Sequence, residues 1–385
     1  MTTQLNQARS WALSVALPFW AEAGIDPRTG GFRERMTFAA EPILDAPHRL
    51  MVQCRQISVY ALARTRGWWN QDDVLGRALD HLVRTYWQAD GKPGWIFSVD
   101  HRGRPLDRRR DTYAHAFALF GLAWGYRVTG DPQLLALADQ TLTFIDIHLS
   151  APDGGGLLDG DVRADRLRRQ NPHMHFLEAM IALAQASGQE RYLARAGEIF
   201  GLFSARFFEP TTGALGEYFD ENWQPHGTPD PLCEPGHHFE WVWLLRHYQR
   251  LTGRSVDRYA VGLYEHARRH GFDAQGFVID ELSTTGQPTK RSRRSWPHAE
   301  AIKAEAVEHE GGRPGCDARA EQLLGIVNTT YLAGPFAGGW VDHVDEAGRP
   351  LVDYVPASTL YHLLFAIVEA DRVFGTAAEP GSHAP

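Results

Sequence analysis

The 385-residue chain has few cysteines and no excess of basic charge. Its three cysteines, Cys54, Cys233 and Cys316, are odd in number and lack the spacing of a metal site. We therefore expect free thiols and a reducing compartment. The formal net charge of -8 argues against nucleic acid as a partner, because binding it requires a basic face.

Signals for export, membrane insertion and flexible linkage are also lacking. The apolar run from Trp11 to Trp20 is too short to cross a bilayer, and no basic segment precedes it. We therefore expect a soluble cytoplasmic protein with no membrane partner. No Ser/Gly tract or charge block interrupts the chain, which predicts one catalytic domain over residues 1–375 and a frayed tail over 376–385.

Glycine, in contrast, is plentiful and recurs in six turns. The turns are spaced by about 60 residues, and such a period indicates a repeated supersecondary unit. They contain Gly30-Gly31, Gly94, Gly154-Gly155-Gly156, Gly213 with Gly216, Gly276, and Gly338-Gly339.

Between the turns, apolar residues recur at helical spacing and predict two helices in each unit. The expected helices span 4–22, 48–66, 71–88, 111–129, 132–148, 172–187, 190–208, 236–252, 255–271, 297–309, 316–332 and 356–374. One helix of a pair is apolar on all sides, as over 114–128, which is typical of a buried helix. Its partner carries charge on one face, as over 189–207. This pattern predicts an all-α (α/α)6 barrel of six helical hairpins, with short β-hairpins and loops at one mouth.

One polar residue follows each glycine turn by about 20 positions. These residues are Arg55, His115, His175, His237, His298 and His362. Each long connector leads into an inner helix, so all six lie near inner-helix N-termini, where free N–H groups can also bind polar ligands. We therefore expect the six repeats to direct these residues toward a single site.

Two motifs contain imidazole and carboxylate at helical spacing. In the segment 234–241, His237 and Glu240 are three residues apart and share one helix face. His175 and Glu178 repeat that spacing. A carboxylate beside an imidazole fixes its tautomer and raises its basicity, as a general base requires.

A pair of facing histidines is suited to proton transfer beside a carbonyl group. One imidazole can remove the proton next to the carbonyl, and the same or the other imidazole can return it. Return to the neighbouring carbon converts an aldose into a ketose, whereas return to the opposite face of the same carbon gives an epimer. Arg55 could hold the developing oxyanion, and Tyr113, Trp241 and Trp296 could pack on the apolar face of a sugar.

These motifs resemble the N-acylglucosamine 2-epimerase superfamily over nearly the whole chain, from Arg55 to His362. The form Asn-Pro-His-Met-His-x-x-Glu-Ala at 171–179 is similar to the mannose isomerase branch, which includes aldose–ketose isomerases of the sulfosugar pathway. The resemblance implies an (α/α)6 barrel and a reaction that needs no metal or other cofactor. It also implies that His237 and His362 are the acid/base pair. The resemblance further implies that Arg55, Asn171, His175 and Glu240 support this pair in the reaction. The chain departs from many relatives, which carry glutamine, at His298.

Several functional alternatives remain open at this stage. The first choice is interconversion of D-mannose and D-fructose, with D-lyxose/D-xylulose as further substrates, through a cis-enediol. A mannose/glucose 2-epimerase with the same histidines, or an isomerase of a sulfo-sugar, is the alternative. A glycoside hydrolase would need two opposed carboxylates instead, and a sugar-binding module would not need paired histidines. The expected partner is a monosaccharide, bound by a monomer or homodimer.

Some of the polar residues have simpler interpretations. His173 and His238 point away from the expected site and favour structural roles, while Tyr113 competes with His115 as the contact from its repeat. Zinc is disfavoured, because no cysteine joins the histidine pairs. The arginine run at 291–294 is interpreted as a solvated loop, with an anion site for phosphate or sulfonate as the alternative. Trp296 and His298 complete the expected sugar contacts.

Overall fold

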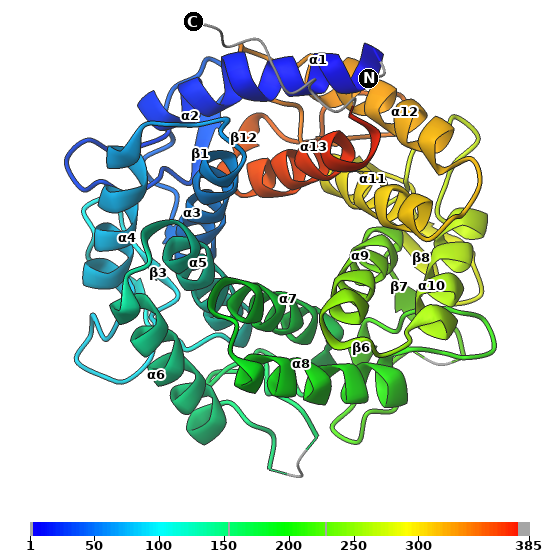
Figure 1. The fold of residues 1–385 in the computed structure, drawn as a ribbon, viewed down its shortest axis with the longest axis horizontal. Helices are drawn as coiled ribbons and strands as arrows, with labels where there is room; N and C mark the ends of the chain where they lie inside the picture. The colour runs from blue at the N-terminus through cyan, green and yellow to red at the C-terminus, as the bar shows by residue number, and fades with distance from the viewer. Residues whose placement is uncertain (1–2, 153–154, 228, 376–385) are drawn as a thin grey trace, which may run out of the picture.

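Two concentric rings of helices surround a central axis (Figure 1). The computed structural model describes residues 3–152, 155–227 and 229–375. The inner ring consists of α3 (Leu50–Thr65), α5 (Thr112–Thr129), α7 (Gln170–Ser187), α9 (Pro235–Thr252), α11 (Ser295–Glu310) and α13 (Leu360–Phe374). The outer ring consists of α1 (Thr3–Trp11) with α2 (Leu17–Glu22), then α4 (Asp72–Tyr86), α6 (Pro132–His148), α8 (Glu190–Leu202), α10 (Asp257–His270) and α12 (Cys316–Ile326). The predicted all-α (α/α)6 barrel is confirmed.

Three outer helices include a π-helical turn that the sequence did not reveal. These turns are η1 (Ala12–Ala16), η2 (Phe203–Phe207) and η3 (Val327–Tyr331). Each continues an outer helix shortly before a glycine turn. The continuous helices expected over 4–22, 190–208 and 316–332 are therefore each composed of α and π segments.

Local capping explains where the helices begin and end. Gly130, Gly188 and Gly253 end α5, α7 and α9 in the left-handed conformation, with φ between 68° and 70°. The Asp131 side chain accepts a hydrogen bond from the N–H of Gln133 at the start of α6. These short connectors set the antiparallel pairing of inner and outer helices.

Short antiparallel strands link the long connectors at one mouth of the barrel. Within the described residues they form five small sheets. The strands are β1 (Arg35–Thr37), β2 (His48–Arg49), β3 (Ser98–Val99), β4 (Pro105–Asp107), β5 (Arg168–Arg169), β6 (Tyr218–Phe219), β7 (Leu232–Cys233), β8 (Glu281–Ser283), β9 (Pro288–Lys290), β10 (Arg293–Arg294), β11 (His343–Val344) and β12 (Tyr354–Pro356). Strands that lead into inner helices pair with strands of the following connector: β2 with β3, β5 with β6, β7 with β8, and β10 with β11.

The same pairing closes the ring, because β12 before the last inner helix pairs with β1 of the first connector. The expected mouth hairpins exist as β3–β4 and β8–β9. Residues 277–280, just before β8, make only an isolated bridge, between Val278 and Phe272. The linked connectors hold the N-terminal ends of the inner helices in fixed positions around the axis.

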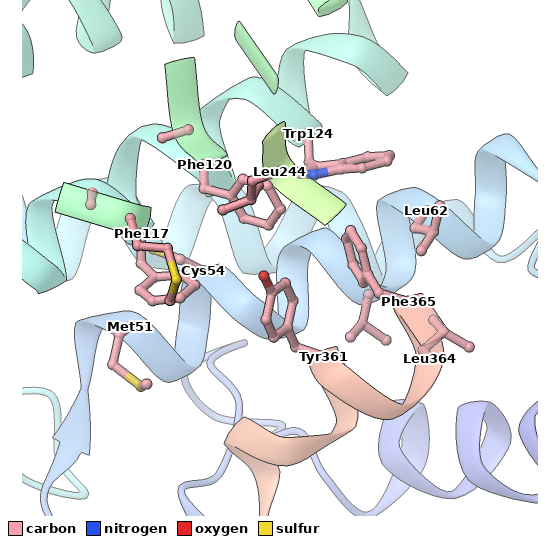
Figure 2. Packing of buried hydrophobic residues seen from close by; sticks show 14 of the residues in the cluster. Met51, Cys54, Leu62, Phe117, Phe120, Trp124, Leu244, Tyr361, Leu364 and Phe365 are labelled. Atoms are coloured by element: carbon pink, nitrogen blue, oxygen red, sulfur yellow. The ribbon is translucent and has the colours of Figure 1, made fainter. Parts of the chain in front are cut away.

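Aromatic side chains from opposite parts of the chain fill the centre of the barrel (Figure 2). Phe117, Phe120 and Trp124 of α5 meet Tyr361 and Phe365 of α13 there. The Trp124 and Phe365 ring centroids are 5.5 Å apart, in an edge-to-face arrangement. This packed layer separates the two ends of the barrel axis.

The remaining sequence expectations concern thiols, membrane spans and termini. Cys54, Cys233 and Cys316 are buried free thiols, as expected. No helix of the described chain is long and apolar enough to cross a membrane. The predicted tail over 376–385 and Gly154 of the third turn lie outside the described residues.

Candidate active site

A cavity of about 470 Å³ opens where the inner helices begin. Eight of the nine predicted site residues line it. They are Arg55, Tyr113, Asn171, His175, His237, Glu240, Trp296 and His362. The ninth, His298, is not among the lining residues. The rest of the wall includes Glu34, Arg35, Arg49, Glu234, Arg294, Asp342, Tyr354, Ser358 and Thr359.

His237 lies in the first turn of α9 and is held by a carboxylate that the sequence did not indicate. Its Nδ1 is 3.0 Å from both oxygens of Glu217. The prediction that Glu240 orients this imidazole is therefore wrong, since Glu217 accepts the Nδ1–H. Its Nε2 has no protein hydrogen bond in the described chain and is available to the cavity.

Carboxylates make His237 a stronger base than an ordinary histidine. Burial by itself lowers the pKa of His237, but Glu217 and Glu234 outweigh burial and raise the pKa to about 9. His237 is therefore an imidazolium at neutral pH and a proton donor. Glu217 is itself held in place by the side-chain N–H of Gln170, at 2.9 Å.

His362 lies in the first turn of α13 and has the opposite character. Its Nδ1 donates to Glu300 at 2.7 Å, and the second oxygen of Glu300 is 2.6 Å from Nζ of Lys303. Burial lowers the pKa of His362 to about 3, because Arg55 and Lys303 offset the attraction of Glu300. His362 is therefore neutral at physiological pH and can accept a proton at Nε2.

Trp296 lies between the two histidines. Its ring centroid is 5.1 Å from that of His237 and 5.5 Å from that of His362. The chain can bring Trp296 this close to α9 only because residue 236 is glycine: a Cβ on Gly236 would lie 2.5 Å from the indole. Trp296 thus forms the part of the cavity wall that lies beside both histidines. Trp241, in contrast, is fully buried against Phe203 and does not line the cavity, so its predicted sugar contact is wrong.

His175 and Glu240 lie at the cavity floor. Nδ1 of His175 is 2.9 Å from Glu178, which confirms the predicted helical pair. Burial lowers the pKa of His175 to about 4, so this imidazole is neutral. Burial, together with Glu300, raises the pKa of Glu240 well above its usual value. Its Oε1 has no hydrogen-bond partner among the described residues, so a protonated Glu240 is free to bond a substrate oxygen.

Arg55 is held by aromatic rings rather than by an acid. Its guanidinium carbon lies 4.3 Å from the Phe117 ring centroid and 5.0 Å from that of Tyr361. Nη2 donates to the Tyr113 hydroxyl at 2.7 Å. Since no carboxylate in the described residues forms an ion pair with it, the positive charge of Arg55 remains available to an oxyanion.

A separate set of buried residues at the same helix ends is structural. In each, a ring nitrogen or amide oxygen accepts the backbone N–H of a residue just after a glycine turn. The set comprises Gln53, His115, His173, His238 and His298. For the four histidines these distances are 2.8 to 3.1 Å, and the other ring nitrogen bonds the carbonyl four residues earlier.

This set shows that the distance of a residue from the glycine turn does not by itself identify the residues that face the cavity. The predicted substrate contact by His298 is wrong, because both of its ring nitrogens are engaged by backbone and it lies outside the cavity wall. His115 has the same structural role, and Tyr113 is the cavity residue of its repeat. The structural roles expected for His173 and His238 are confirmed.

A repeated acidic position was missed in the sequence. It comes four residues after the left-handed glycine of four turns, as Glu34, Glu217, Asp280 and Asp342. Glu34 binds Arg49, and Asp280 binds Arg294. The regular offset from glycine was present in the sequence and could have identified Glu217.

The arginine run at 291–294 does not form a common anion patch. Arg293 pairs with Asp273 at 2.5 Å, and Arg294 pairs with Glu234 at 2.8 Å. Exposed Arg291 lies 4.0 Å from Glu346. Of these arginines only Arg294 lines the cavity, and acids already neutralise it.

Four clusters of side-chain donors among the described residues could hold a cation, and three of them include a histidine of the cavity. Glu217, Glu234 and His237 form one such set, and Glu240, Glu300 and His362 form another. In each set the histidine already donates its Nδ1–H to a carboxylate. The geometry is that of proton-sharing pairs.

Comparison with known proteins gives a consistent result. Residues 30–366 match the family model described as N-acylglucosamine 2-epimerase (GlcNAc 2-epimerase). A protein of Rhizobium meliloti named mannose-6-phosphate isomerase is 31% identical, with 96% of this chain and 97% of its own covered. A D-mannose isomerase of Thermobifida fusca is 29% identical, with 78% of each chain covered.

Solved structures show the same architecture. A cellobiose 2-epimerase of Bacillus thermoamylovorans superposes with a TM-score of 0.84 at 22% identity, covering 96% of this chain and 99% of its own. A crystal structure of D-mannose isomerase superposes with a TM-score of 0.83 at 19% identity, covering 97% and 98%. At these identities the structural likeness establishes the fold.

Proposed function

Because the chain belongs to the N-acylglucosamine 2-epimerase family and is a sugar isomerase or epimerase, we propose that it interconverts D-mannose and D-fructose. The observation that carries the proposal is the contrast between His237 and His362. Both face one cavity, both are oriented by carboxylates, and their pKa values are shifted in opposite directions. Residues 1–375 form the one catalytic domain in this proposal.

The contrast supports a division of the proton transfers of an aldose–ketose isomerisation between the two histidines. Neutral Nε2 of His362 removes the proton from C2 of open-chain mannose, while the imidazolium of His237 protonates O1. The product of this step is a cis-enediol. His362 then delivers its proton to C1, and neutral His237 takes the hydroxyl proton from O2. Atoms and charges balance: one proton moves from C2 to C1 and one from O2 to O1 by exchange.

The remaining cavity residues stabilise charge and hold the substrate. Arg55 can stabilise the oxygen that gains negative charge during enediol formation. Protonated Glu240 and the unpartnered amide oxygen of Asn171 can bond sugar hydroxyls. Trp296 supports the apolar face of the sugar beside the two histidines.

The charge pattern of the cavity favours a neutral hexose. Arg49 is neutralised by Glu34, and Arg294 is neutralised by Glu234 and Asp280. Those arginines are therefore already occupied before a substrate arrives. A free sugar requires no further cation beyond Arg55.

A second candidate substrate is mannose 6-phosphate. Arg35 lines the cavity and stacks on Tyr354, with its guanidinium carbon 4.5 Å from the ring centroid, and it forms no ion pair in the part of the chain that is described. A phosphate at the rim could bind it. The name of the Rhizobium meliloti relative points to the same substrate class.

Incubation in heavy water distinguishes these possibilities. We expect the protein to convert D-mannose into D-fructose with deuterium entering C1, as followed by NMR and chromatography. Glucose as the main product would instead identify a 2-epimerase. A higher kcat/KM for mannose 6-phosphate would identify a phosphosugar enzyme, and Arg35→Gln would then abolish that preference. Absence of both fructose and deuterium uptake would refute the proposal for mannose.

Variants of the two histidines test their assignment. His237→Gln and His362→Gln should each lose nearly all turnover. His362→Gln should also lose deuterium exchange at C2, because it removes the base. His298→Gln is the matched control, since that histidine is likewise buried and both of its ring nitrogens bond backbone atoms.

A further inference from the structure

A second cavity, of about 560 Å³, lies at the opposite end of the barrel. Its wall comes from the C-terminal halves of the inner helices, whereas the first cavity lies at their N-termini. The apolar part of the wall includes Leu62, Phe120, Trp124, Leu244 and Phe365, which Figure 2 shows gathered at this end of the central layer. The proposed sugar reaction makes no use of this cavity.

Two arginines at this cavity lack the acids that neutralise their neighbours. Arg66 and Arg127 are exposed, line the cavity and form no ion pair within residues 3–152, 155–227 and 229–375. Partial burial and repulsion by Arg66 both lower the pKa of Arg127. Arg372 on the same wall, in contrast, pairs with Glu369 and Glu310. The cavity therefore carries an uncompensated positive charge at one side.

The wall also contains a buried hydrogen-bond donor without an acceptor. The Trp124 side chain is 9% exposed, and its indole N–H has no partner among the described residues. In Figure 2 the indole nitrogen lies on the side of the ring toward Phe120 and Leu244, which also line the cavity. Leaving a buried donor unpaired is unfavourable, so a bound acceptor at this position would be favoured.

We propose that this cavity is a second ligand site, for a small organic anion with an aromatic or apolar body. The anionic group binds Arg66 and Arg127 and accepts the Trp124 N–H, while the body packs on Phe120 and Phe365. Charge-assisted bonds from guanidinium groups suit a phosphate, sulfonate or carboxylate. The cavity volume is in the range of small-molecule sites.

One residue that lines this cavity also holds a histidine of the first cavity in place. Glu178 lines the second cavity, while its Oε2 bonds His175, which lines the first. Tyr361 donates to the other oxygen of Glu178. The two cavities are therefore distinct, but one carboxylate is shared between their walls.

Calorimetric titration with phenyl phosphate tests the proposal, with benzyl alcohol as the uncharged analogue. We expect saturable binding of one phenyl phosphate per chain and at least about tenfold weaker binding of benzyl alcohol. The double variant Arg66→Gln/Arg127→Gln should weaken phenyl phosphate binding by about tenfold or more. Trp124→Phe, which removes only the indole donor and some ring area, should weaken it several-fold.

Arg254→Gln is the matched control. Arg254, like Arg127, is an exposed arginine over an aromatic ring: its guanidinium carbon is 4.6 Å from the Phe200 centroid, and that of Arg127 is 5.1 Å from the Trp124 centroid. Arg254 lies outside the cavity. Its substitution should leave the affinity unchanged. Absence of saturable binding, or equal affinities of the parent and the double variant, would overturn the proposal, because phenyl phosphate would then not bind or would bind elsewhere.

Discussion

Replacing Glu217 by glutamine should convert the proton donor of the site into an ordinary buried histidine. Glu217 and Glu234 raise the pKa of His237 from 6.5 to about 9 against the effect of burial, which corresponds to about 3 kcal/mol in favour of the imidazolium. Glutamine keeps the size of Glu217 and can still bond Gln170 and Nδ1 of His237, but it removes the charge. We therefore expect the pKa of His237 to fall to about 6.5 or below.

The assay is the pH dependence of kcat/KM for mannose isomerisation. In the parent enzyme the imidazolium of His237 persists up to pH about 9, so activity should fall only above that pH. In Glu217→Gln the alkaline limb should shift to about pH 6.5 or lower, and activity at pH 7.5 should fall about tenfold below the acid plateau.

A control variant in the same connector tests whether the shift requires the loss of a carboxylate beside His237 or follows from the loss of any carboxylate. Glu221 follows Glu217 by four residues, is 43% exposed and lies 3.7 Å from Arg163. Glu221→Gln should leave the alkaline limb in place. An unchanged limb in Glu217→Gln would refute the assignment of His237 as a carboxylate-raised acid.

Three further substitutions test other parts of the site. Lys303→Met should lower the free energy of unfolding by about 3 kcal/mol or more, because it leaves buried carboxylates uncompensated. It should also raise the pKa of His362. Urea denaturation measures the first effect, and the acid limb of the pH profile measures the second. His298→Leu should lower the free energy of unfolding by about 1–3 kcal/mol, because a hydrogen bond to the backbone is lost, and should leave KM unchanged. A large rise in KM would instead show that His298 contacts the sugar. Gly236→Ala places a Cβ 2.5 Å from Trp296, so kcat should fall about tenfold while the midpoint of unfolding changes little; wild-type kcat would show that the indole position is unimportant.

The barrel could be predicted from the sequence because its determinants are local and repeated. Helical periodicity, capping glycines such as Gly130 and Gly188, and the glycine turns recur in each unit. In several pairs one helix is apolar on all sides, as α5 is, which marks it as an inner helix; α11, with buried Glu300, Lys303 and Glu305, is an exception. The π-helical turns were missed because a single inserted residue hardly disturbs the apolar spacing.

The site was predicted less completely, because spacing alone does not show where a side chain points. His173 and His175 differ by two positions on one helix, yet the first bonds the backbone after a glycine turn and the second faces the cavity. The sequence placed His298 in the cavity because its distance from the turn matches that of His237 within a few residues. One helical residue changes the direction of a side chain by about 100°, so this precision is insufficient.

The partners of the two catalytic candidates were missed for a different reason. Glu217 precedes His237 by 20 residues, and Glu300 precedes His362 by 62. Glu217 lies in the connector that leads into α9, and Glu300 lies in the inner helix α11 next to α13, so no helical spacing relates either acid to its histidine. The path of one connector brings Glu217 to His237, and the packing of two neighbouring inner helices brings Glu300 to His362.

One repeated scaffold thus produces two histidines of opposite character through the burial and the charged groups around each of them. His237 and His362 occupy corresponding places at the beginning of inner helices, and each donates Nδ1–H to a carboxylate. The charged groups next to the two carboxylates differ: Glu217 has Glu234 nearby, whereas Glu300 contacts fully buried Lys303. Two acids outweigh burial and keep His237 charged, whereas burial, together with Arg55 and Lys303, outweighs Glu300 and leaves His362 neutral. Such a pair provides one proton donor and one proton acceptor at the same time, as a reversible isomerisation requires.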